Sequence, residues 1–330
     1  MNIKERIAAG LAGKYKGLNI KLSGISKYIF GIQRSTYYLV GGISGSGKTT
    51  LVDFMLLSAI EDAIKQDIPI HVIYYSFEID KLTKDCNWLS NIAFNKFNVI
   101  ISPEKIKGLG DNRLTTEEQE LIDKCIPILD NLKKYIHFEY QPTNPTGINH
   151  QIFNHCESIG KIHYEDYTDN SNVKKKKIVG YTPNNPDQYI LVVTDNLENL
   201  KTENNMNNKE NIDKFSEYMV LSRNLFGITP IVVSQFNDGL SSVDRAKFKG
   251  VDLSPQITDF KSTRQPYADC EVAIGLMCPW KLDMNRCLGY DLNVYKESFI
   301  MCKIIKNRLS KDNIATGLIF NPQAGIFTEI

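Results

Sequence analysis

The sequence predicts an α/β fold with a mostly parallel central sheet. Residues 37–40, 70–77 and 189–195 are runs rich in aromatic and β-branched side chains, as expected of parallel strands that are buried on both faces. Segments with a helical spacing of apolar residues alternate with these runs, which is the order of elements in a parallel α/β sheet. The 330 residues suffice for one large domain or two small ones, and we find no internal repeat in them.

The first run leads directly into a glycine-rich loop and then into a helix. The motif G-x-x-x-x-G-K-T extends from Gly42 to Thr49, and apolar residues then repeat at helical spacing from Leu51 to Ile64. Glycines let the backbone N–H groups of such a loop turn toward phosphate oxygens, and the helix N-terminus adds the positive end of its dipole. The order of strand, loop and helix therefore predicts a P-loop that binds a nucleotide.

Two side chains of this loop have specific expected tasks. Lys48 can reach the β- and γ-phosphates, and the hydroxyl of Thr49 can ligate magnesium. The expected ligands are therefore ATP and Mg²⁺. The residues expected to surround the nucleotide are Gly42, Ser44, Gly45, Ser46, Gly47, Lys48, Thr49 and Thr50.

Polar side chains follow three of the expected strands. Glu78 is either the group that orients or deprotonates the attacking water or an acid that complements the dipole of a helix beginning near Asp80. Asp195 ends its run at the carboxyl edge, where ligands bind in such sheets. It matches the acid of the second nucleotide-binding motif, which holds magnesium through water. Gln235 ends the strand 229–235, where it either senses the γ-phosphate or is a satisfied strand-end amide.

Local signals predict the remaining elements in order. Pro103 occupies a first helical position, and Thr115 with Glu118 forms a capping box. The further expected helices cover 3–11, 80–98, a segment that begins at 102–104, 115–132, 149–158 and 210–226. The further expected strands cover 135–140, 229–235, 271–277, 299–305, 315–320 and 325–330. The last of these predict a C-terminal β-hairpin.

Two stretches are expected to lie outside the core. Residues 1–35 form an N-terminal arm or linker, extended over 17–32, ahead of an ATPase domain that covers 36–330. Residues 160–188 interrupt the α/β pattern and are expected to form a surface insertion of hairpin type. The run Lys174 to Lys177 within it is either a solvated face or a DNA contact.

Composition restricts the partners. Hydrophobic residues make up 42% of the chain and charged residues 23%, as in ordinary soluble proteins. The net charge is +1, so the chain has no global basic field, and contacts to nucleic acid must come from local patches. The candidates for such a patch lie in the irregular segment 236–268 and are Arg245, Lys247, Lys249, Lys261 and Arg264.

The cysteines and the apolar runs indicate the compartment. Seven cysteines are scattered without a C-x-x-C pair, which favours reduced thiols in a cytoplasm. His150, His155, Cys156 and His163 lie close in sequence, but their spacing fits no standard set of ligands, so a metal site there is a minor alternative. The N-terminus lacks the apolar segment of a signal peptide, and no apolar run approaches ~18 residues, so we expect no membrane association.

Taken together and in order, several motifs resemble those of the DnaB-like replicative helicases, which have a RecA-type ATPase core. The resemblance extends from about residue 17 to residue 330. The stretches that carry it are Tyr75-Ser76-Phe77-Glu78-Ile79, similar to F-S-L-E-M; Asp195-Asn196-Leu197-Glu198-Asn199-Leu200, similar to D-Y-L-Q-L; Val233-Ser234-Gln235-Phe236-Asn237, similar to L-S-Q-L-N; Asp259-Phe260-Lys261-Ser262 with Ala268-Asp269, similar to D-L-R-E-S…D-A-D; and Lys306-Asn307-Arg308, similar to K-Q-R.

The resemblance implies roles for the matching residues. Glu78 would be the catalytic base, and Gln235 would couple the γ-phosphate to DNA. Lys261 would contact the backbone of single-stranded DNA, although the family has arginine at this position. Lys306 and Arg308, expected on a turn between two C-terminal strands, would reach into the nucleotide site of the neighbouring subunit. The implied assembly is a ring-shaped homo-hexamer that hydrolyses ATP at its subunit interfaces.

The chain also departs from this family. It has no counterpart of the helical N-terminal domain of bacterial members and no primase, and the segments 160–188 and 279–297 have no family counterpart. It looks like a short, phage-type form that would work in the cytoplasm of a bacterial host. A primase or a helicase loader would then be further partners, besides single-stranded DNA.

Three functions share the P-loop. The leading prediction is an ATP-driven helicase motor that translocates on single-stranded DNA in replication. A RecA-like recombinase or an ssDNA-binding mediator ATPase should lack a K-x-R turn at this position. A small-molecule P-loop kinase would need an arginine-rich lid, which we do not find in the sequence.

Overall fold

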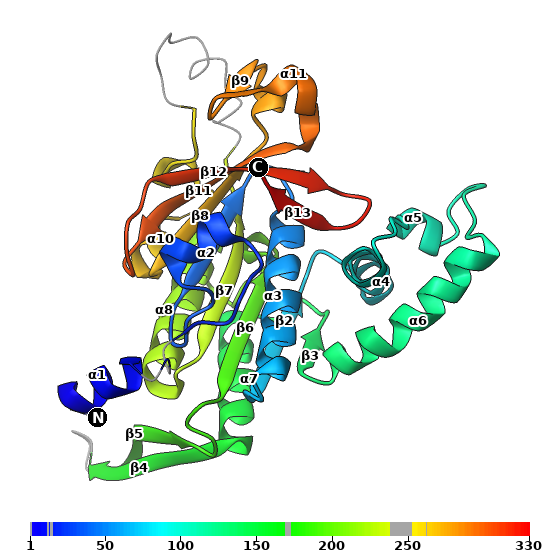
Figure 1. Ribbon diagram of the computed structural model, residues 1–330. Helices are drawn as coiled ribbons and strands as arrows, with labels where there is room; N and C mark the ends of the chain where they lie inside the picture. The colour runs from blue at the N-terminus through cyan, green and yellow to red at the C-terminus, as the bar shows by residue number, and fades with distance from the viewer. Residues whose placement is uncertain (1, 12, 14–15, 169–172, 238–252, 262) are drawn as a thin grey trace.

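The structure, a computed structural model, describes residues 2–11, 13, 16–168, 173–237, 253–261 and 263–330. Within these residues the main element is a nine-stranded sheet in the order β13-β12-β11-β8-β1-β7-β6-β2-β3 (Figure 1). Its strands are β1 (Tyr38–Gly42), β2 (Ile70–Ser76), β3 (Ile136–Glu139), β6 (Tyr189–Asp195), β7 (Thr229–Gln235), β8 (Val272–Met277), β11 (Phe299–Asn307), β12 (Ile314–Asn321) and β13 (Ile326–Glu329).

The sheet has a parallel part and an antiparallel part. The strands β3-β2-β6-β7-β1-β8 run parallel to one another. The strands β11, β12 and β13 continue the sheet from β8 in antiparallel fashion. The expected α/β fold, the mostly parallel sheet and the C-terminal hairpin are confirmed. All carboxyl ends of the parallel strands lie at one edge of the sheet, whereas β11 ends at the opposite edge.

Helices cover both faces of the sheet and give it two cores. Tyr38 and Val40 of β1 pack with α3, α4 and α6 on one face, while Tyr37 and Leu39 pack with α7 and α8 on the other. This alternation follows from the two-residue repeat of a strand. The helices are α1 (Ile3–Leu11), α2 (Ser23–Ile29), α3 (Lys48–Lys65), α4 (Lys81–Phe97), α5 (Pro103–Ile106), α6 (Thr116–Lys133), α7 (Pro145–Ser158), α8 (Asn208–Phe226), α10 (Gln265–Asp269) and α11 (Leu292–Tyr295).

Side-chain caps determine where several helices begin. The capping box expected from Thr115 and Glu118 is present at the start of α6. The expected first turn at Pro103 is present in α5. The helix α7 begins four residues earlier than expected, because the side chain of Asn144 accepts a hydrogen bond from the N–H of Gly147 at 2.8 Å and a proline follows the cap.

The N-terminal arm differs from its expectation. Residues 17–32, expected to be extended, contain the helix α2, and the bridge between Leu18 and Ile32 closes this segment into a loop. The side chain of Glu329 at the end of β13 accepts hydrogen bonds from Ser23 and Gly24 at 2.7 and 2.6 Å. The segment 17–32 also contributes buried apolar residues to the core on the α3 face of the sheet. They are Leu18, Ile20, Leu22, Ile25, Ile29 and Ile32. The apolar spacing changes from two to three and four at position 22, which is the helical signal that the sequence analysis overlooked.

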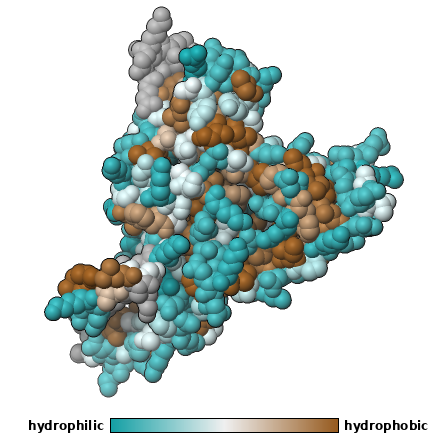
Figure 2. All heavy atoms as spheres, in the orientation of Figure 1, coloured by the Kyte–Doolittle hydropathy of each residue, from teal (hydrophilic) through white to brown (hydrophobic). Residues whose placement is uncertain are grey.

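The expected amphipathic helix over residues 3–11 is confirmed as α1. Its apolar side chains Ile3, Ile7 and Leu11 recur every four residues and are exposed. A hydrophobic, brown group lies over α1 at the lower left of Figure 2. In the part of the chain that the structure describes, no helix is both long enough and apolar enough to cross a membrane.

The insertion at 160–188 forms the expected hairpin. Its strands β4 (Gly160–Thr168) and β5 (Lys174–Pro183) pair in antiparallel fashion and extend below the sheet in Figure 1. Asp166 lies opposite Lys176, and Glu165 lies opposite Lys177, so acids face part of the lysine run. The hairpin leads into the first residue of β6, at the edge opposite Asp195. A DNA contact by these lysines stays a hypothesis.

Among the described residues, His150, His155, Cys156 and His163 do not form the metal site considered from the sequence. His155 of α7 packs edge-on against His71, with ring centroids 5.4 Å apart, while His163 contacts the hydroxyl of Thr182 at 2.8 Å. No three His, Cys, Asp or Glu side chains among the described residues are grouped so as to hold a metal ion. Burial, with the nearby charges of His71 and His137, lowers the pKa of His155 to about 4.

We predict that the substitution His155→Gln makes the protein less sensitive to mild acid. A histidine with a pKa below its ordinary 6.5 in the folded state binds more protons when unfolded. Its stabilising contribution is therefore present above pH 6.5 and is lost as the pH falls toward 4. Because the ring is partly exposed, the expected extra loss in unfolding free energy from pH 7 to pH 5 is about 1 kcal/mol.

Urea unfolding of both proteins at the two pH values measures this difference. The exposed His150 on the same helix supplies the control, since His150→Gln should lose as much stability as the unsubstituted protein. Equal losses in His155→Gln and in the unsubstituted protein would contradict the assignment.

Candidate nucleotide-binding site

The glycine-rich loop joins the carboxyl end of β1 to the start of α3. Gly45 and Gly47 have φ angles of +71° and +82°, a region that favours glycine. The hydroxyl of Ser46 and the ammonium group of Lys48 both donate to the carbonyl of Ile43, at 2.8 and 3.0 Å. The loop therefore curls around this carbonyl and places the predicted nucleotide-binding residues on the loop and the first turn of α3.

The start of α3 is suited to an anion. Gly47 precedes the helix and provides no side-chain cap, so no side chain of the cap residue satisfies the first N–H groups of α3. Burial lowers the pKa of Lys48, and the negative charges of Glu78, Glu198 and Asp195 oppose this shift. A polyphosphate would meet uncapped N–H groups and a buried lysine here, which fits the expected nucleotide.

Thr49 and Asp195 meet at the edge of the sheet. The hydroxyl of Thr49 donates to Oδ1 of Asp195 at 3.1 Å. Oδ2 of Asp195 is buried and has no hydrogen-bond partner among the described residues. Burial raises the pKa of Asp195 to about 6, and the charge of Lys84 limits the shift. A hydroxyl beside a carboxylate with a free buried oxygen is a suitable oxygen donor set for Mg²⁺.

Glu78 lies beside this pair and is not the cap of the next helix. Its Oε2 accepts a hydrogen bond from the side-chain amide of Asn196 at 2.5 Å. The cap of α4 is Asp80, whose carboxylate accepts from the N–H of Thr83 at 3.0 Å and from its hydroxyl at 2.6 Å. Glu78 is therefore an exposed carboxylate that Asn196 holds, and the N-cap of α4 is a different acid. Both roles of Glu78, as the catalytic base and as an acid that complements the dipole of α4, stay predictions.

Glu198 is a site residue that the sequence analysis did not single out. Its Oε1 accepts from the hydroxyl of Ser234 at 3.0 Å and from the N–H of Gln235 at 3.1 Å, and thus holds the end of β7. Within the described residues its Oε2 is buried without a partner. Burial raises the pKa of Glu198, while the bond from Gln235 and the charge of Lys48 lower it. Glu198 therefore connects the segment after Asp195 to Gln235.

A buried ion pair supports the site from behind. Lys84 of α4 is fully buried and donates to both carboxylate oxygens of Asp53 at 3.2 and 3.0 Å and to the hydroxyl of Tyr74 at 2.9 Å. Asp53 lies one helical turn after Thr49, so the pair ties α3 to α4 and to β2. Removing one partner of such a pair typically costs about 3–5 kcal/mol. The network therefore fixes the helix that carries the P-loop.

Two of the predicted DNA-binding residues lie within the described residues, and one of them, Lys261, lies next to Gln235. The N–H of Lys261 donates to the carbonyl of Gln235 at 2.9 Å, and the neighbouring Phe260 packs edge-on against Phe236 with ring centroids 5.0 Å apart. Arg264 immediately precedes α10, and its side chain, like that of Lys261, is exposed. The other three predicted contacts, Arg245, Lys247 and Lys249, lie outside the described residues.

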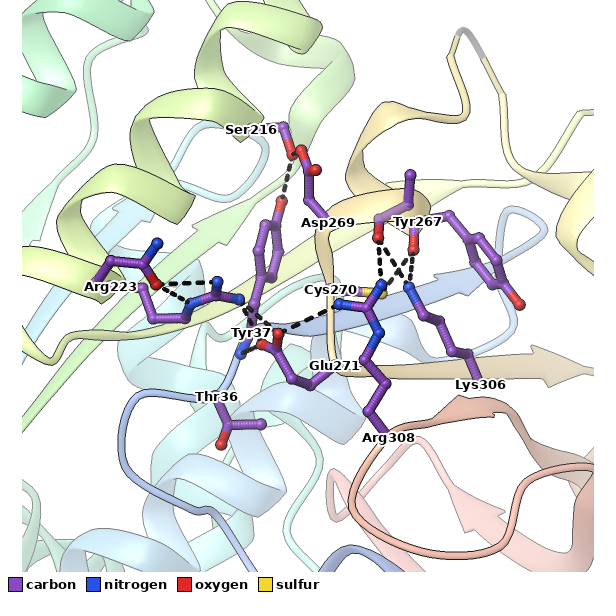
Figure 3. A network of polar contacts seen from close by, with 12 residues as sticks. Thr36, Tyr37, Ser216, Arg223, Tyr267, Asp269, Cys270, Glu271, Lys306 and Arg308 are labelled. Atoms are coloured by element: carbon purple, nitrogen blue, oxygen red, sulfur yellow. Dashed lines mark hydrogen bonds and ion pairs between the residues drawn. The ribbon is translucent and has the colours of Figure 1, made fainter. Parts of the chain in front are cut away.

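Lys306 does not lie on the expected turn, whereas Arg308 lies between β11 and β12 as expected. Lys306 lies within β11 and not on the turn, because the strand continues to Asn307, and Arg308 follows directly. As the two-residue spacing predicts, both side chains extend the same way, and both donate to the carbonyl of Ala268, at 3.0 and 3.2 Å (Figure 3). In the ladder, Lys306 is paired with Ala273 near the start of β8. The pair is thus at the edge opposite the P-loop.

Comparisons with known proteins identify the fold. No protein-family model matches the sequence, and no match was found among the curated proteins. Among solved structures, an isolated ATPase domain matches with a TM-score of 0.71 at 15% identity, over 100% of this chain and 99% of that one. A DnaB-like replicative helicase, described with its interactions with primase, matches with a TM-score of 0.69 at 16% identity, over 99% of this chain and 67% of its own.

This chain has the fold of a DnaB-like helicase ATPase domain. The RecA-like core expected from the motifs is therefore confirmed at the level of fold. The roles of single residues rest on the geometry of the site described above.

We predict that Glu78→Gln leaves nucleotide binding intact and slows ATP hydrolysis by a factor on the order of 10²–10⁴, the usual scale for loss of a general base. Gln can still accept the bond from Asn196 but cannot take a proton. The control is Asp80→Ala, which removes the cap of α4 and should cost ~1 kcal/mol in stability while hydrolysis survives. Binding of a fluorescent ATP analogue and steady-state phosphate release separate the two effects. Normal hydrolysis by Glu78→Gln would contradict the assignment of the base.

Proposed function

We propose that this protein is an ATP-dependent DNA helicase motor that translocates on single-stranded DNA in replication and hydrolyses ATP at the subunit interfaces of a ring. The observation that carries the proposal is the separation of two sets of charged groups. The P-loop, Asp195 and Glu78 lie at one edge of the sheet, and Lys306 and Arg308 lie at the other. We therefore propose that each subunit contributes its P-loop edge to one site, as the first half, and its Lys306 and Arg308 to the site of a neighbour, as the second half.

The first half binds the nucleotide. The N–H groups of the loop and of the first turn of α3 face the phosphates, and Lys48 leaves the carbonyl of Ile43 to pair with the β- and γ-phosphates. Thr49 and Asp195 hold Mg²⁺, which neutralises charge on the phosphates. Burial of these groups strengthens each of the interactions, because the local dielectric constant is lower than in water.

The same half positions the attacking water. Glu78 accepts the proton of this water, and Asn196 orients the carboxylate through its hydrogen bond of 2.5 Å. Gln235 senses the γ-phosphate, and its backbone is held between Glu198 and Lys261 at 3.1 and 2.9 Å. Loss of the γ-phosphate would therefore shift the end of β7 and, through the bond between Gln235 and Lys261, the predicted DNA contact.

The second half serves the neighbouring subunit. Tyr38 and Asn307 are both level with Val272, whereas Gly42 lies four positions further along β1, or about 13 Å. The P-loop extends still further from that edge, so Lys306 and Arg308 cannot reach the nucleotide of their own subunit. An arginine supplied by a neighbour stabilises charge on the transferring phosphoryl group, because its planar fork binds phosphate oxygens in two places.

DNA binding is assigned to the segment around α10. The exposed side chains of Lys261 and Arg264 contact phosphates, which gives a grip that is independent of base sequence and sensitive to salt. Arg245, Lys247 and Lys249 are proposed to extend the same surface. We assign the assembly as a homo-hexamer in the cytoplasm, with a primase or a loader as further partners.

We predict that the protein with ATP unwinds a forked DNA duplex and that Lys48→Ala does not, because no other cation of the loop can neutralise the β- and γ-phosphates. The control is Lys65→Ala, an exposed lysine at the far end of the same helix, which should unwind normally. Strand displacement is measured on forks with a 5′ or a 3′ tail. ATP-dependent coating of single strands without displacement from either fork would favour the recombinase or mediator function instead.

A further inference from the structure

Glu271, the residue before β8, lies between two arginines. Nη1 of Arg223, on α8, contacts both carboxylate oxygens of Glu271 at 2.6 and 2.7 Å, and the N–H of Tyr37 donates to the same carboxylate at 2.8 Å. Nη1 of Arg308 approaches from the other side, at 3.7 Å (Figure 3). The backbone N–H of Arg308 also donates to the carbonyl of Glu271 at 2.9 Å, which keeps the two residues adjacent.

The two arginines are held very differently. The side chain of Arg223 is 14% exposed, and its remaining nitrogens donate to the side chain of Asn224 at 3.1 and 3.0 Å. The side chain of Arg308 is 56% exposed, and its charge pair with Glu271 is longer. Arg223 is thus a fixed partner of Glu271, whereas Arg308 is a loosely held one.

The end of α10 provides the rest of the contacts to this cationic pair. The carbonyls of Tyr267 and Ala268 accept from Lys306 at 2.6 and 3.0 Å, and that of Ala268 also accepts from Arg308 at 3.2 Å. The last carbonyls of a helix lack partners within it and attract cations. Because α10 begins directly after Arg264, the helix that carries these acceptors adjoins a proposed DNA contact.

We propose that Glu271 and the carbonyl end of α10 form a resting dock for Arg308, and that Arg223 is the positioning residue that lets Arg308 leave it. This inference rests on the proposed function, in which Arg308 acts on the nucleotide of the neighbour. The dock holds the guanidinium on its own subunit in the absence of DNA, and the neighbour's γ-phosphate competes with Glu271 for it.

Release from this dock leaves no buried charge unpaired. When Arg308 departs, Glu271 keeps the contacts to Arg223 and to the N–H of Tyr37. An unpaired buried carboxylate would otherwise oppose the movement. An exposed ion pair of this kind is weak. Loss of the pair between Arg308 and Glu271 therefore changes the equilibrium constant between docked and released Arg308 by roughly two- to fivefold.

The test compares two substitutions with opposite expected effects on kcat for ATP hydrolysis without DNA. Glu271→Gln keeps an acceptor for Tyr37 but loses the charge that attracts Arg308, so kcat should rise roughly two- to fivefold. Arg223→Gln leaves Arg308 as the only cation within ion-pair distance of Glu271 among the described residues, so kcat should fall by a similar factor. The conservative variant Arg223→Lys should restore the original rate, because a single nitrogen makes both contacts to Glu271.

The KM for ATP should stay unchanged in these variants, because the dock lies at the edge opposite the P-loop. Single-stranded DNA should stimulate ATP hydrolysis by Glu271→Gln less than hydrolysis by the unsubstituted protein. A structural role alone would lower kcat in both variants together with their melting temperatures. Equal or same-sign changes in kcat would therefore overturn the dock.

Arg308→Ala separates this inference from the proposed function. If Arg308→Ala hydrolyses ATP at the normal rate, the proposed role of Arg308 between subunits is wrong, and the dock has no purpose. If Arg308→Ala is inactive while Glu271→Gln and Arg223→Gln do not change kcat in opposite directions, the dock alone is wrong. Opposite changes together with an inactive Arg308→Ala support both.

Discussion

The direction of the strands is the constraint on which the rest of this structure depends. Parallel strands place the P-loop, Asp195 and the end of β7 at one edge of the sheet, because the carboxyl ends of such strands lie together. The antiparallel strand β11 returns to the other edge and carries Lys306 and Arg308 there. No adjustment of side chains can bring the two sets together within a subunit. The topology of one chain thus requires a second copy to complete the proposed reaction.

At the proposed nucleotide site, carboxylates and lysines of opposite charge lie close together in a partly buried environment. Asp195 is buried and Glu198 is half-buried, both have raised pKa values, and each has one buried oxygen that no described residue satisfies. Lys84 offsets part of this negative charge, and Lys48 offsets another part. Incompletely paired groups at a buried position gain more free energy from binding a cation and a polyphosphate than the same groups in water would. The incompletely paired carboxylates therefore destabilise the fold and at the same time favour binding of a cation with a polyphosphate.

Sequence patterns predicted the fold more completely than the site. Buried runs such as 189–195 and the loop from Gly42 to Thr49 are local signals, and both are present as expected. The helix α2 was missed because it is only seven residues long, so its change of apolar spacing rests on two buried residues, Ile25 and Ile29. Glu198 and Glu271 were also missed as functional residues. Their partners lie between 36 and 234 residues away in the chain, so only the folded sheet brings them together.

The most direct test of the central claim is to mix two inactive variants. Arg308→Ala retains Glu78, and Glu78→Gln retains Arg308, so a ring of both contains interfaces with two intact halves. Random assembly of equal amounts gives such pairs at about a quarter of the interfaces. ATP hydrolysis should therefore reappear on mixing, in proportion to subunit exchange followed with fluorescently labelled protein. A mixture that exchanges fully and stays inactive would contradict a site shared between subunits.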